Sequence, residues 1–324
     1  MQAFVISEPG GPEKLELKQI ARPAVKPGWV LIRNRAFGLN RSEWFTRRGD
    51  SPSVSFPRVL GIECVGEVVS AAGDELATGQ AVAAMMGGMG RDFDGSYAEF
   101  VLVPRDIVFP IESDLAWPVL AALPEMLQTV HGSLYTGLEI GSARNILIRG
   151  ATSSIGYASI AVAKSAGLEI TATTRDLVKA DELRTAGADH VIVDKGSIAE
   201  QAHSIYAAGF DRVLELIGTT TLLDSLQSAR PGGIVCMTGI LGGEWVIPEF
   251  APMDAIPTGV KLTSYSGGAA DITPAQLQHY VALVEGGKLE IRTGPRFLFT
   301  ELQQAHALMD DNRANGKIVI TLDS

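Results

Sequence analysis

The chain has 324 residues and a formal net charge of -10, and 46% of its residues are hydrophobic. This length favours two domains, because a single hydrophobic core stops growing at about 250–300 residues. The acidic balance argues against nucleic acid or an anionic membrane as a partner, since both require clustered lysine and arginine. Two cysteines are too few for a disulfide framework or a four-cysteine zinc lobe. The N-terminus lacks a basic segment followed by an apolar one, so we expect no signal peptide and a cytoplasmic protein.

The first part of the chain, residues 1–120, predicts short strands joined by turns. Strands are expected in segments with apolar or alternating patterns, at residues 1–6, 29–35, 65–70 and 80–85. Proline and glycine are spread between these segments, and no helical period persists. We therefore expect an all-β unit with loops.

From about residue 121 the pattern changes to strands that alternate with helices. Strands are expected at residues 145–148, 169–173, 190–193, 212–216 and 234–238, and helices at 157–166, 177–186 and 222–229. Such alternation predicts a parallel, doubly wound sheet with right-handed crossovers. The remaining residues predict helices at 274–285 and 300–310 and a final strand at 317–321.

A loop of small residues follows the strand at 145–148. A phosphate-binding turn needs a strand, a tight loop and a helix whose N-terminal amides face the anion. The residues expected to bind a pyrophosphate are Ala151, Thr152, Ser153, Ser154, Ile155 and Gly156. Only Gly156 matches the three-glycine fingerprint, so the motif is weak by itself and the strand–turn–helix context supports it. The alternative is a turn whose small residues serve only helix–strand packing.

The end of the second strand indicates which dinucleotide binds. An NAD site usually has an acidic residue there for the ribose hydroxyls, whereas an NADP site has hydroxyl and basic residues. Thr174 and Arg175 stand at this point and Lys179 follows, which favours NADPH. Asp176 weakens this interpretation, and the alternative is that both basic residues only begin a solvated helix. The residues expected beside the nicotinamide follow the fifth strand and are Gly239, Ile240 and Leu241.

Several short motifs stand in a fixed order along nearly the whole chain. They are Lys26-Pro27-Gly28, Gly38-Leu39-Asn40 with Glu43, Gly61-Ile62-Glu63 before Gly66, Gly95-Ser96-Tyr97-Ala98-Glu99-Phe100, and Gly316-Lys317-Ile318-Val319. In this order they resemble the motifs of the medium-chain dehydrogenase/reductase superfamily, specifically its zinc-free quinone oxidoreductase branch. The chain departs from the family where Asp194 replaces a tyrosine that often lies near the adenine, and where Phe45 replaces another tyrosine.

The resemblance implies an α/β protein with two domains. Residues 1–120 and 265–324 would form a GroES-like, β-rich catalytic domain, and residues 121–264 would form an inserted Rossmann domain that binds NADPH. The resemblance also implies a homodimer in which the Rossmann domains join edge to edge. We expect the strand at 234–238 to form that edge.

Zinc-dependent relatives carry a cysteine, a histidine and a third ligand at positions that the resemblance assigns to Asn40, Ile62 and about Thr129. Neither asparagine nor isoleucine replaces a thiolate or an imidazole on zinc. The five histidines show no ligand spacing, and a lone histidine is usually structural; His131 is the one to examine. We therefore expect no metal and no Lewis-acid alcohol oxidation.

The implied reaction is hydride transfer from NADPH to a quinone or to the activated C=C of an α,β-unsaturated carbonyl. Asn40 is the candidate for bonding the acceptor carbonyl or the nicotinamide ribose, and Thr129 for the nicotinamide amide. The alternatives are a turn-capping asparagine and a threonine that packs in a helix. Tyr97 is a weaker candidate for proton donor, since its strand motif favours a structural role. The alternative functions are an enoyl-thioester reductase, a non-catalytic, crystallin-like NADPH-binding protein and, weakest, a zinc alcohol dehydrogenase.

Overall fold

The computed structural model describes residues 1–51, 54–71 and 76–322. The chain divides into two compact units. Unit 1 comprises Met1–Gln128, Gly268–Gly286 and Thr293–Ser324, and unit 2 comprises Thr129–Gly267 and Gly287–Arg292. The first crossing between the units therefore follows Gln128, not residue 120, and the segment Gly287–Arg292, expected with the C-terminal part, packs with unit 2.

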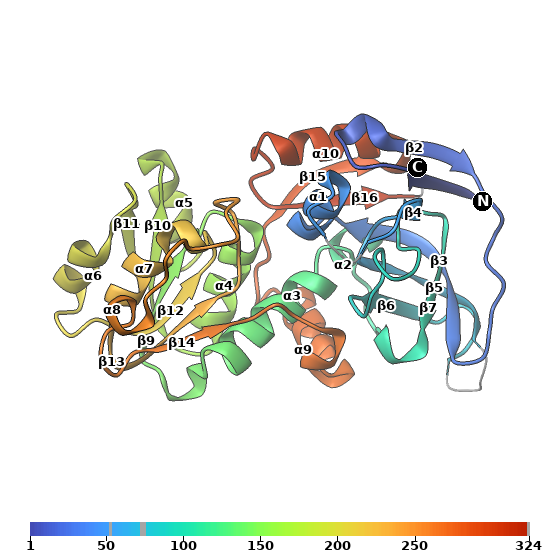
Figure 1. Cartoon of the computed structure of the whole chain (residues 1–324). Coiled ribbons are helices and arrows are strands. Elements are labelled where there is room, and N and C mark those ends of the chain that lie inside the picture. The colour runs from blue at the N-terminus through green and yellow to red at the C-terminus, as the bar shows by residue number, and fades with distance from the viewer. Residues whose placement is uncertain (52–53, 72–75, 323–324) are drawn as a thin grey trace. The chain divides into compact units, whose positions relative to one another are not determined.

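Unit 2 contains a six-stranded parallel sheet (Figure 1). Its strands are β9 (Asn145–Arg149), β10 (Glu169–Thr174), β11 (His190–Val193), β12 (Phe210–Glu215), β13 (Ala229–Met237) and β14 (Lys261–Ser264). Their spatial order is β11-β10-β9-β12-β13-β14, and all neighbouring pairs are parallel. The predicted doubly wound sheet is confirmed, with its topological switch between β9 and β12.

Helices cover this sheet, and its central strands are buried on both faces. Every residue of β9 and of β12 is buried, as expected for parallel strands between two helical layers. The helices are α4 (Ser154–Ser165), α5 (Ala180–Thr185), α6 (Ala199–Ile205), α7 (Thr219–Gln227) and α8 (Pro252–Ala255). Of these, α4 packs against β9 and β10, α5 against β11, and α7 against β12 and β13.

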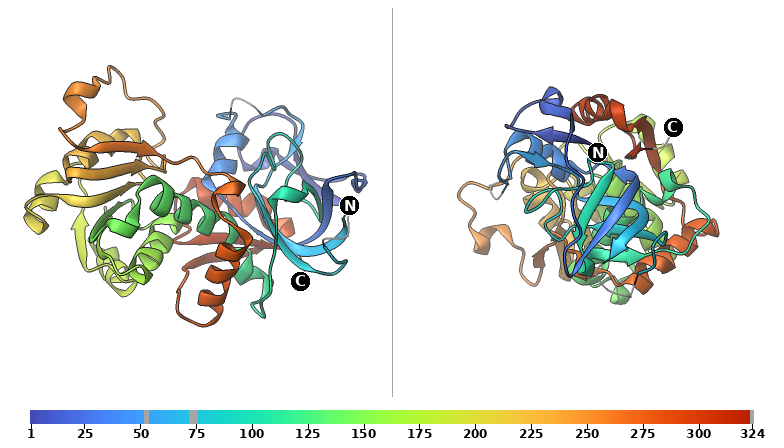
Figure 2. Two further views of the ribbon diagram at one scale, coloured as in Figure 1. Left: turned by 90° about the horizontal axis from the view of Figure 1, so that it is seen from below. Right: turned by 90° about the vertical axis from the view of Figure 1, so that its right-hand side faces the viewer.

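Unit 1 is built around a seven-stranded and a three-stranded sheet (Figure 2). Its strands are β1 (Gln2–Ile6), β2 (Leu15–Gln19), β3 (Trp29–Gly38), β4 (Arg58–Val59), β5 (Glu63–Ala71), β6 (Ala81–Met85), β7 (Phe100–Pro104), β8 (Val108–Pro110), β15 (Thr293–Leu298) and β16 (Lys317–Thr321). The larger sheet has the order β15-β16-β3-β5-β6-β8, and β7 also pairs with β3. The C-terminal strand β16 therefore completes a sheet that the N-terminal part begins.

The helices of unit 1 have between four and 12 residues, and α3 continues across the boundary with unit 2. They are α1 (Arg41–Arg48), α2 (Trp117–Leu120), α3 (Pro124–His131), α9 (Pro274–Glu285) and α10 (Leu302–Asp310). Aromatic rings fill the core of this unit: Phe37 stacks on Tyr97 with centroids 5.1 Å apart and meets Phe299 edge-on at 6.4 Å. Among the described residues, no helix combines the length and apolar character needed to cross a membrane.

Two expectations from the sequence are wrong. The strand at 234–238 is not an edge, because β13 lies between β12 and β14, and β14 ends the sheet. The region before residue 121 does contain α-helices, α1 and the four-residue α2. Three of the four buried residues of α1 are polar (Glu43, Thr46 and Arg47, beside Phe45), so the apolar period that usually reveals a helix is weak.

Candidate functional site

The turn after β9 has the strand–turn–helix geometry expected of a phosphate-binding loop. Gly150 has a φ of +82°, a left-handed conformation that favours glycine. The Ser153 hydroxyl caps α4, accepting from the Gly156 amide (3.1 Å) and donating to the Gly150 carbonyl (2.9 Å). Gly156 lies so close to the backbone of Ala151 that a Cβ would not fit. These residues therefore build the turn.

Other residues of the turn remain available to a ligand. Ala151 is fully buried, whereas Thr152, Ser154 and Ile155 are half-buried. The hydroxyls of Thr152 and Ser154 make no hydrogen bond to any residue that the structure describes. Because α4 is 12 residues long, the amides of its first turn carry the positive end of a helix dipole. Amides and hydroxyls together suit a pyrophosphate.

The end of β10 leaves a basic side chain exposed. Thr174 is buried, and its hydroxyl accepts from the Asp176 amide and donates to the Asp176 carbonyl, both at 3.1 Å. The Asp176 carboxylate accepts from the Val178 amide (3.0 Å) and so caps the 3-10 turn that precedes α5. Arg175 is exposed, and no hydrogen bond or ion pair reaches it from the described residues. Lys179 is half-buried at the end of this turn.

The segment after β13 carries the residues predicted for the nicotinamide half. Its backbone returns along the end of β12: the Gly239 amide donates to Glu215 (3.2 Å) and the Leu241 amide to Leu216 (3.1 Å). A Cβ on Gly239 would overlap the carbonyl of Leu216, so this close approach needs glycine. Ile240 is half-buried and Leu241 is 36% exposed.

Two hydroxyl groups that the sequence analysis did not identify, those of Ser133 and Thr238, connect Thr129 to the segment after β13. The Ser133 hydroxyl donates to the Thr129 carbonyl (2.6 Å) and lies 2.9 Å from the hydroxyl of Thr238, which directly follows β13. Ser133 belongs to a π-helical turn, Gly132–Gly137, and such turns often mark functional sites. Two separately predicted regions of the site, Thr129 and the end of β13, therefore lie together. Proximity to the fifth strand could have indicated Thr238, but nothing in the local sequence marks Ser133.

Asn40, in unit 1, occupies the N-cap position of α1 and is 7% exposed. Its side-chain amide donates to Glu63 (3.0 Å) and Glu43 (3.2 Å), and its carbonyl accepts from the ammonium of Lys317. The backbone N–H of Asn40 donates to Glu43 (3.1 Å). Both amide hydrogens of the side chain are therefore used inside the protein.

Lys317 lies at the centre of this buried cluster. Its ammonium is 2.7 Å from Glu63 and 3.1 Å from Glu125, and Glu63 and Lys317 are fully buried. The second oxygen of Glu63 accepts from the Glu125 amide (2.9 Å). A Cβ on Gly38 would overlap both Glu63 and Lys317. Motifs near the two ends of the chain thus meet in one charge cluster.

Burial and the neighbouring charges shift the pKa values in this cluster in opposite directions. Burial raises the pKa of Glu43 to about 8, although Lys317 lowers it. Burial likewise raises the pKa of Glu63 in spite of the ammonium. For Lys317, burial lowers the pKa, but the carboxylates of Glu63 and Glu125 outweigh it and the pKa is raised. The ammonium is therefore retained, and the cluster holds more carboxyl groups than one cation neutralises.

Tyr97 and His131, two further candidates from the sequence, contact other side chains within the protein. Tyr97 is fully buried, and its hydroxyl lies 2.9 Å from Nε2 of His306, which is also buried. Burial raises the pKa of Tyr97, so it is a poor proton donor. The ring of His131 faces that of Tyr135 at 4.6 Å, and burial lowers its pKa.

Trp44 anchors α1 through contacts with three side chains. Its ring lies between the guanidinium groups of Arg41 (3.8 Å) and Arg48 (4.3 Å), and its indole N–H donates to Asp310. Phe45 is buried on the neighbouring side of the helix. These contacts give both aromatic residues a structural role.

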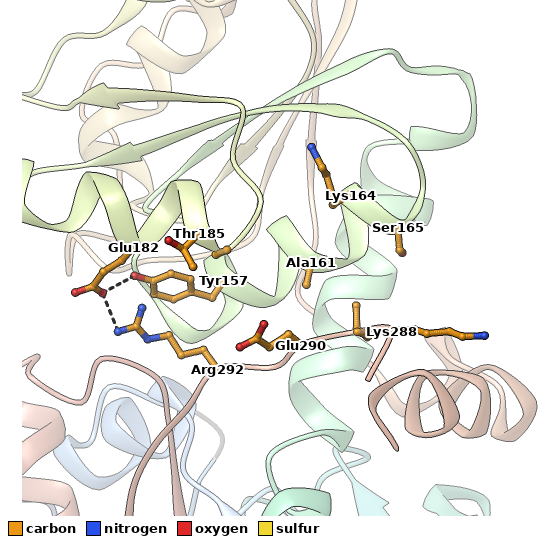
Figure 3. A pocket seen from close by; sticks show the side chains of 11 residues that line it. Tyr157, Ala161, Lys164, Ser165, Glu182, Thr185, Lys288, Glu290 and Arg292 are labelled. Atoms are coloured by element: carbon orange, nitrogen blue, oxygen red, sulfur yellow. Dashed lines mark hydrogen bonds and ion pairs between the residues drawn. The ribbon is translucent and has the colours of Figure 1, made fainter. Parts of the chain in front are cut away.

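A cavity of about 410 Å³ in unit 2 (Figure 3) has none of the predicted cofactor residues in its lining. It is lined by residues of α4, α5 and the segment 288–292, none of which is in the glycine-rich turn or at the end of β10 or β13. Ala161 and Ser165 come from the C-terminal half of α4, whereas dinucleotides bind at the opposite edge of the sheet, where the strands end. The cavity is therefore not the cofactor site.

A three-residue contact fastens the segment Gly287–Arg292 to this surface (Figure 3). Arg292 forms an ion pair with Glu182 (2.7 Å) and lies 4.5 Å above the ring of Tyr157. The Tyr157 hydroxyl donates to the same carboxylate (3.3 Å). These contacts explain why a segment joined at both ends to unit 1 packs with unit 2.

Replacing Arg292 with alanine is expected to lower the free energy of unfolding by about 1 kcal/mol, the sum of one partly exposed ion pair and one cation–π contact. Urea titration followed by circular dichroism measures the change. Arg184→Ala is the matched control, because its 2.7 Å pair with Asp181 has 54% and 93% exposed side chains. Equal losses in both variants would show that the contacts of Arg292 add nothing beyond an exposed pair.

Comparison with known proteins finds two family models that match successive parts of the chain. Residues 26–113 match the family model of the alcohol dehydrogenase GroES-like domain, and residues 186–320 match that of zinc-binding dehydrogenases. The quinone oxidoreductase of Lama guanicoe is 27% identical over 340 residues, which cover 99% of this chain and 98% of the relative. That of Pseudomonas aeruginosa is 27% identical over 338 residues, covering 96% of each chain.

A solved structure shares the fold. The Escherichia coli quinone oxidoreductase complexed with NADPH superimposes with a TM-score of 0.88 at 19% identity, covering 99% of this chain and 100% of that chain. The β-rich GroES-like part and the Rossmann part expected from the sequence are thereby confirmed as the fold class. The chain belongs to the medium-chain dehydrogenase/reductase superfamily, in its quinone oxidoreductase-like branch.

Proposed function

We propose that this protein is an NADPH-dependent, metal-free oxidoreductase that transfers hydride to a quinone or to the activated C=C of an α,β-unsaturated carbonyl. The observation that carries the proposal is the exposed, unpaired guanidinium of Arg175 at the end of β10. This is the position at which a Rossmann site distinguishes a ribose hydroxyl from a 2′-phosphate. The similarity to quinone oxidoreductases, one of them solved with NADPH, supports the same conclusion.

The residues present fit the cofactor. The amides of the first turn of α4 and the free hydroxyls of Thr152 and Ser154 would hold the pyrophosphate. Arg175 and Lys179 would bind the 2′-phosphate. The segment from Gly239 to Leu241 would lie along the nicotinamide half, where Ser133 and Thr238 add hydroxyl groups. NADPH supplies the hydride when bound, and the protein orients it.

The geometry narrows the roles proposed for Asn40 and Thr129. Because both side-chain N–H groups of Asn40 are used by Glu43 and Glu63, donation to an acceptor carbonyl would require breaking a buried hydrogen bond. Its carbonyl keeps a second lone pair, which suits a ribose hydroxyl. We therefore favour the ribose role for Asn40. Thr129 remains the candidate for the nicotinamide amide.

The donor set of the cluster around Lys317 does not fit a catalytic zinc. Asn40 and Ile62 supply no thiolate or imidazole, and the oxygens of Asn40 and Glu63 bind an ammonium. A divalent cation would have to displace this buried group. Within the described ranges, no set of three or more His, Cys, Asp and Glu side chains has the arrangement of a metal site.

Steady-state oxidation of NADPH with a naphthoquinone, an enone and an enoyl thioester tests the function. Cofactor binding is measured in parallel by calorimetry. We expect turnover with a quinone or an enone, unchanged by EDTA, in protein that contains less than stoichiometric zinc. Turnover of the thioester alone would identify an enoyl-thioester reductase. NADPH binding without turnover of any acceptor would instead indicate a non-catalytic binding protein.

We also propose a homodimer formed through β14, the edge of the parallel sheet. An edge strand offers unpaired backbone groups to a second copy. The segment before it exposes Val246 (73%), Phe250 (36%) and Met253 (94%), an apolar surface that favours association. Light scattering after gel filtration should give twice the chain mass of 34.4 kDa. A mass of one chain at micromolar concentration would contradict the dimer.

A further inference from the structure

The ends of β10 and β11 lie side by side in unit 2 (Figure 1). Thr174 is in register with Val193, and the Asp194 amide donates to the Thr174 carbonyl (2.7 Å). Neighbouring strands are about 4.8 Å apart, so Arg175 and the turn after β11 start from adjacent positions. Lys195 is the second residue of that turn and is exposed.

The two carboxylates at this edge, Asp194 and Asp176, accept hydrogen bonds from other groups. Asp194 is 9% exposed, and both its oxygens face the fully buried guanidinium of Arg149, at 2.8 and 3.2 Å. One of these oxygens also accepts from the Gly196 amide (2.7 Å), and the Gly196 carbonyl accepts from Arg149 (3.0 Å). Asp176 caps the turn before α5, as described above. Neither carboxylate is paired with Arg175 or Lys195.

Arg149 holds Asp194 in place because its own hydrogen-bonding capacity is filled. Its remaining N–H bonds go to Asp224 (2.7 Å), Ser225 (3.0 Å) and the Thr221 carbonyl (3.1 Å), all in α7. A fully bonded, buried guanidinium does not release a carboxylate at low cost. The guanidinium of Arg149 therefore holds the Asp194 carboxylate in the interior of the protein.

Two cations are thereby left without partners on adjacent strand ends. In the part of the chain that the structure describes, neither Arg175 nor Lys195 takes part in a hydrogen bond or an ion pair. Lys179 differs, since it does interact with other groups of the protein. Lys195 thus adds a positive charge that no described residue pairs with, on the strand end next to that of Arg175.

We infer that Lys195 is a specificity-determining residue, which with Arg175 forms a two-cation cradle for a phosphate monoester dianion, the 2′-phosphate of NADPH. This inference rests on the proposed cofactor site. A dianion is bound by a planar guanidinium and a flexible ammonium together. NADH lacks the phosphate, so Lys195 would contribute to NADPH affinity alone.

The test is a titration of the full-length protein with NADPH and with NADH, using wild type, Lys195→Gln, Lys195→Arg and Arg175→Gln. We expect Lys195→Gln to weaken NADPH binding about tenfold, the loss of one charge-assisted contact, and to leave NADH binding within about twofold. Lys195→Arg should restore most of the affinity. Lys288→Gln is the matched control, because Lys288 is also exposed but lies at the cavity of Figure 3.

Each other outcome overturns the inference in a distinguishable way. If Arg175→Gln weakens NADPH selectively and Lys195→Gln does not, the proposed function stands and the cradle is wrong. If Lys195→Gln weakens the binding of NADPH and NADH equally, Lys195 does not bind the 2′-phosphate. The wild type could instead bind NADH more tightly than NADPH, with neither substitution changing the ratio of the two dissociation constants. That result would show that both the NADPH assignment and the two-cation cradle are wrong.

Discussion

Replacing Lys317 with methionine is expected to lower the free energy of unfolding by about 3–5 kcal/mol at neutral pH, the cost of breaking a buried ion pair. The ammonium is 2.7 Å from Glu63, and the two side chains are 1% and 0% exposed. Methionine has a similar length but leaves the Glu63 carboxylate without a cation in the interior. Urea titration followed by circular dichroism measures the loss, and Lys288→Met, at an exposed site, should stay within about 0.5 kcal/mol of wild type.

The loss in Lys317→Met should depend on pH in a defined direction. Without the ammonium, burial raises the pKa of Glu63 further above its unfolded value. A carboxyl group with a raised pKa binds its proton more tightly in the folded state, so it destabilises the fold increasingly as pH rises. The variant should therefore be closest to wild type near pH 5 and furthest from it near pH 9. A loss below about 1 kcal/mol at every pH would show that the pair is not needed for stability.

The parts of the fold that could be predicted from the sequence are those that local patterns determine. The helix Pro274–Glu285 and the strand Lys317–Thr321 occur at the predicted residues, because each carries its own period and end signals. The turn at residues 150–156 was also predictable, since its strand, loop and helix follow one another in the chain. The helix α1 was not, because three of its four buried residues are polar.

The parts of the site that escaped prediction depend on contacts between distant residues. Lys317 and Asn40 are 277 positions apart and meet only because β16 pairs with β3. Ser133 and Thr238 meet across 105 positions. The role proposed for Lys195 depends on the register of β10 with β11 and on Arg149, which binds the buried Asp194 carboxylate. Sheet register and burial decide such contacts, and neither can be read from one segment alone.

Replacing Glu43 with glutamine is expected to change how stability depends on pH. Glu43 is buried, and its carboxyl oxygens accept from the Asn40 amide groups (3.1 and 3.2 Å) and from the Ile62 amide (3.3 Å). Burial raises its pKa from 4.5 to about 8. Because this folded-state pKa lies above the unfolded one, the stability that Glu43 contributes is present below about pH 4.5 and is lost as pH rises towards 8.

Glutamine does not titrate, so the comparison isolates this ionisation. Near pH 5, wild type should be more stable by about 1–2 kcal/mol, since the glutamine NH₂ must face a backbone N–H donor. Towards pH 9 the difference should shrink or reverse, by an amount on the order of a few kcal/mol. Glu200→Gln, at an exposed site of α6, should show no such trend. A constant difference for Glu43→Gln would place its ionisation below this pH range, and the hydrogen bonds from Asn40 and Ile62 would then outweigh burial in setting its pKa.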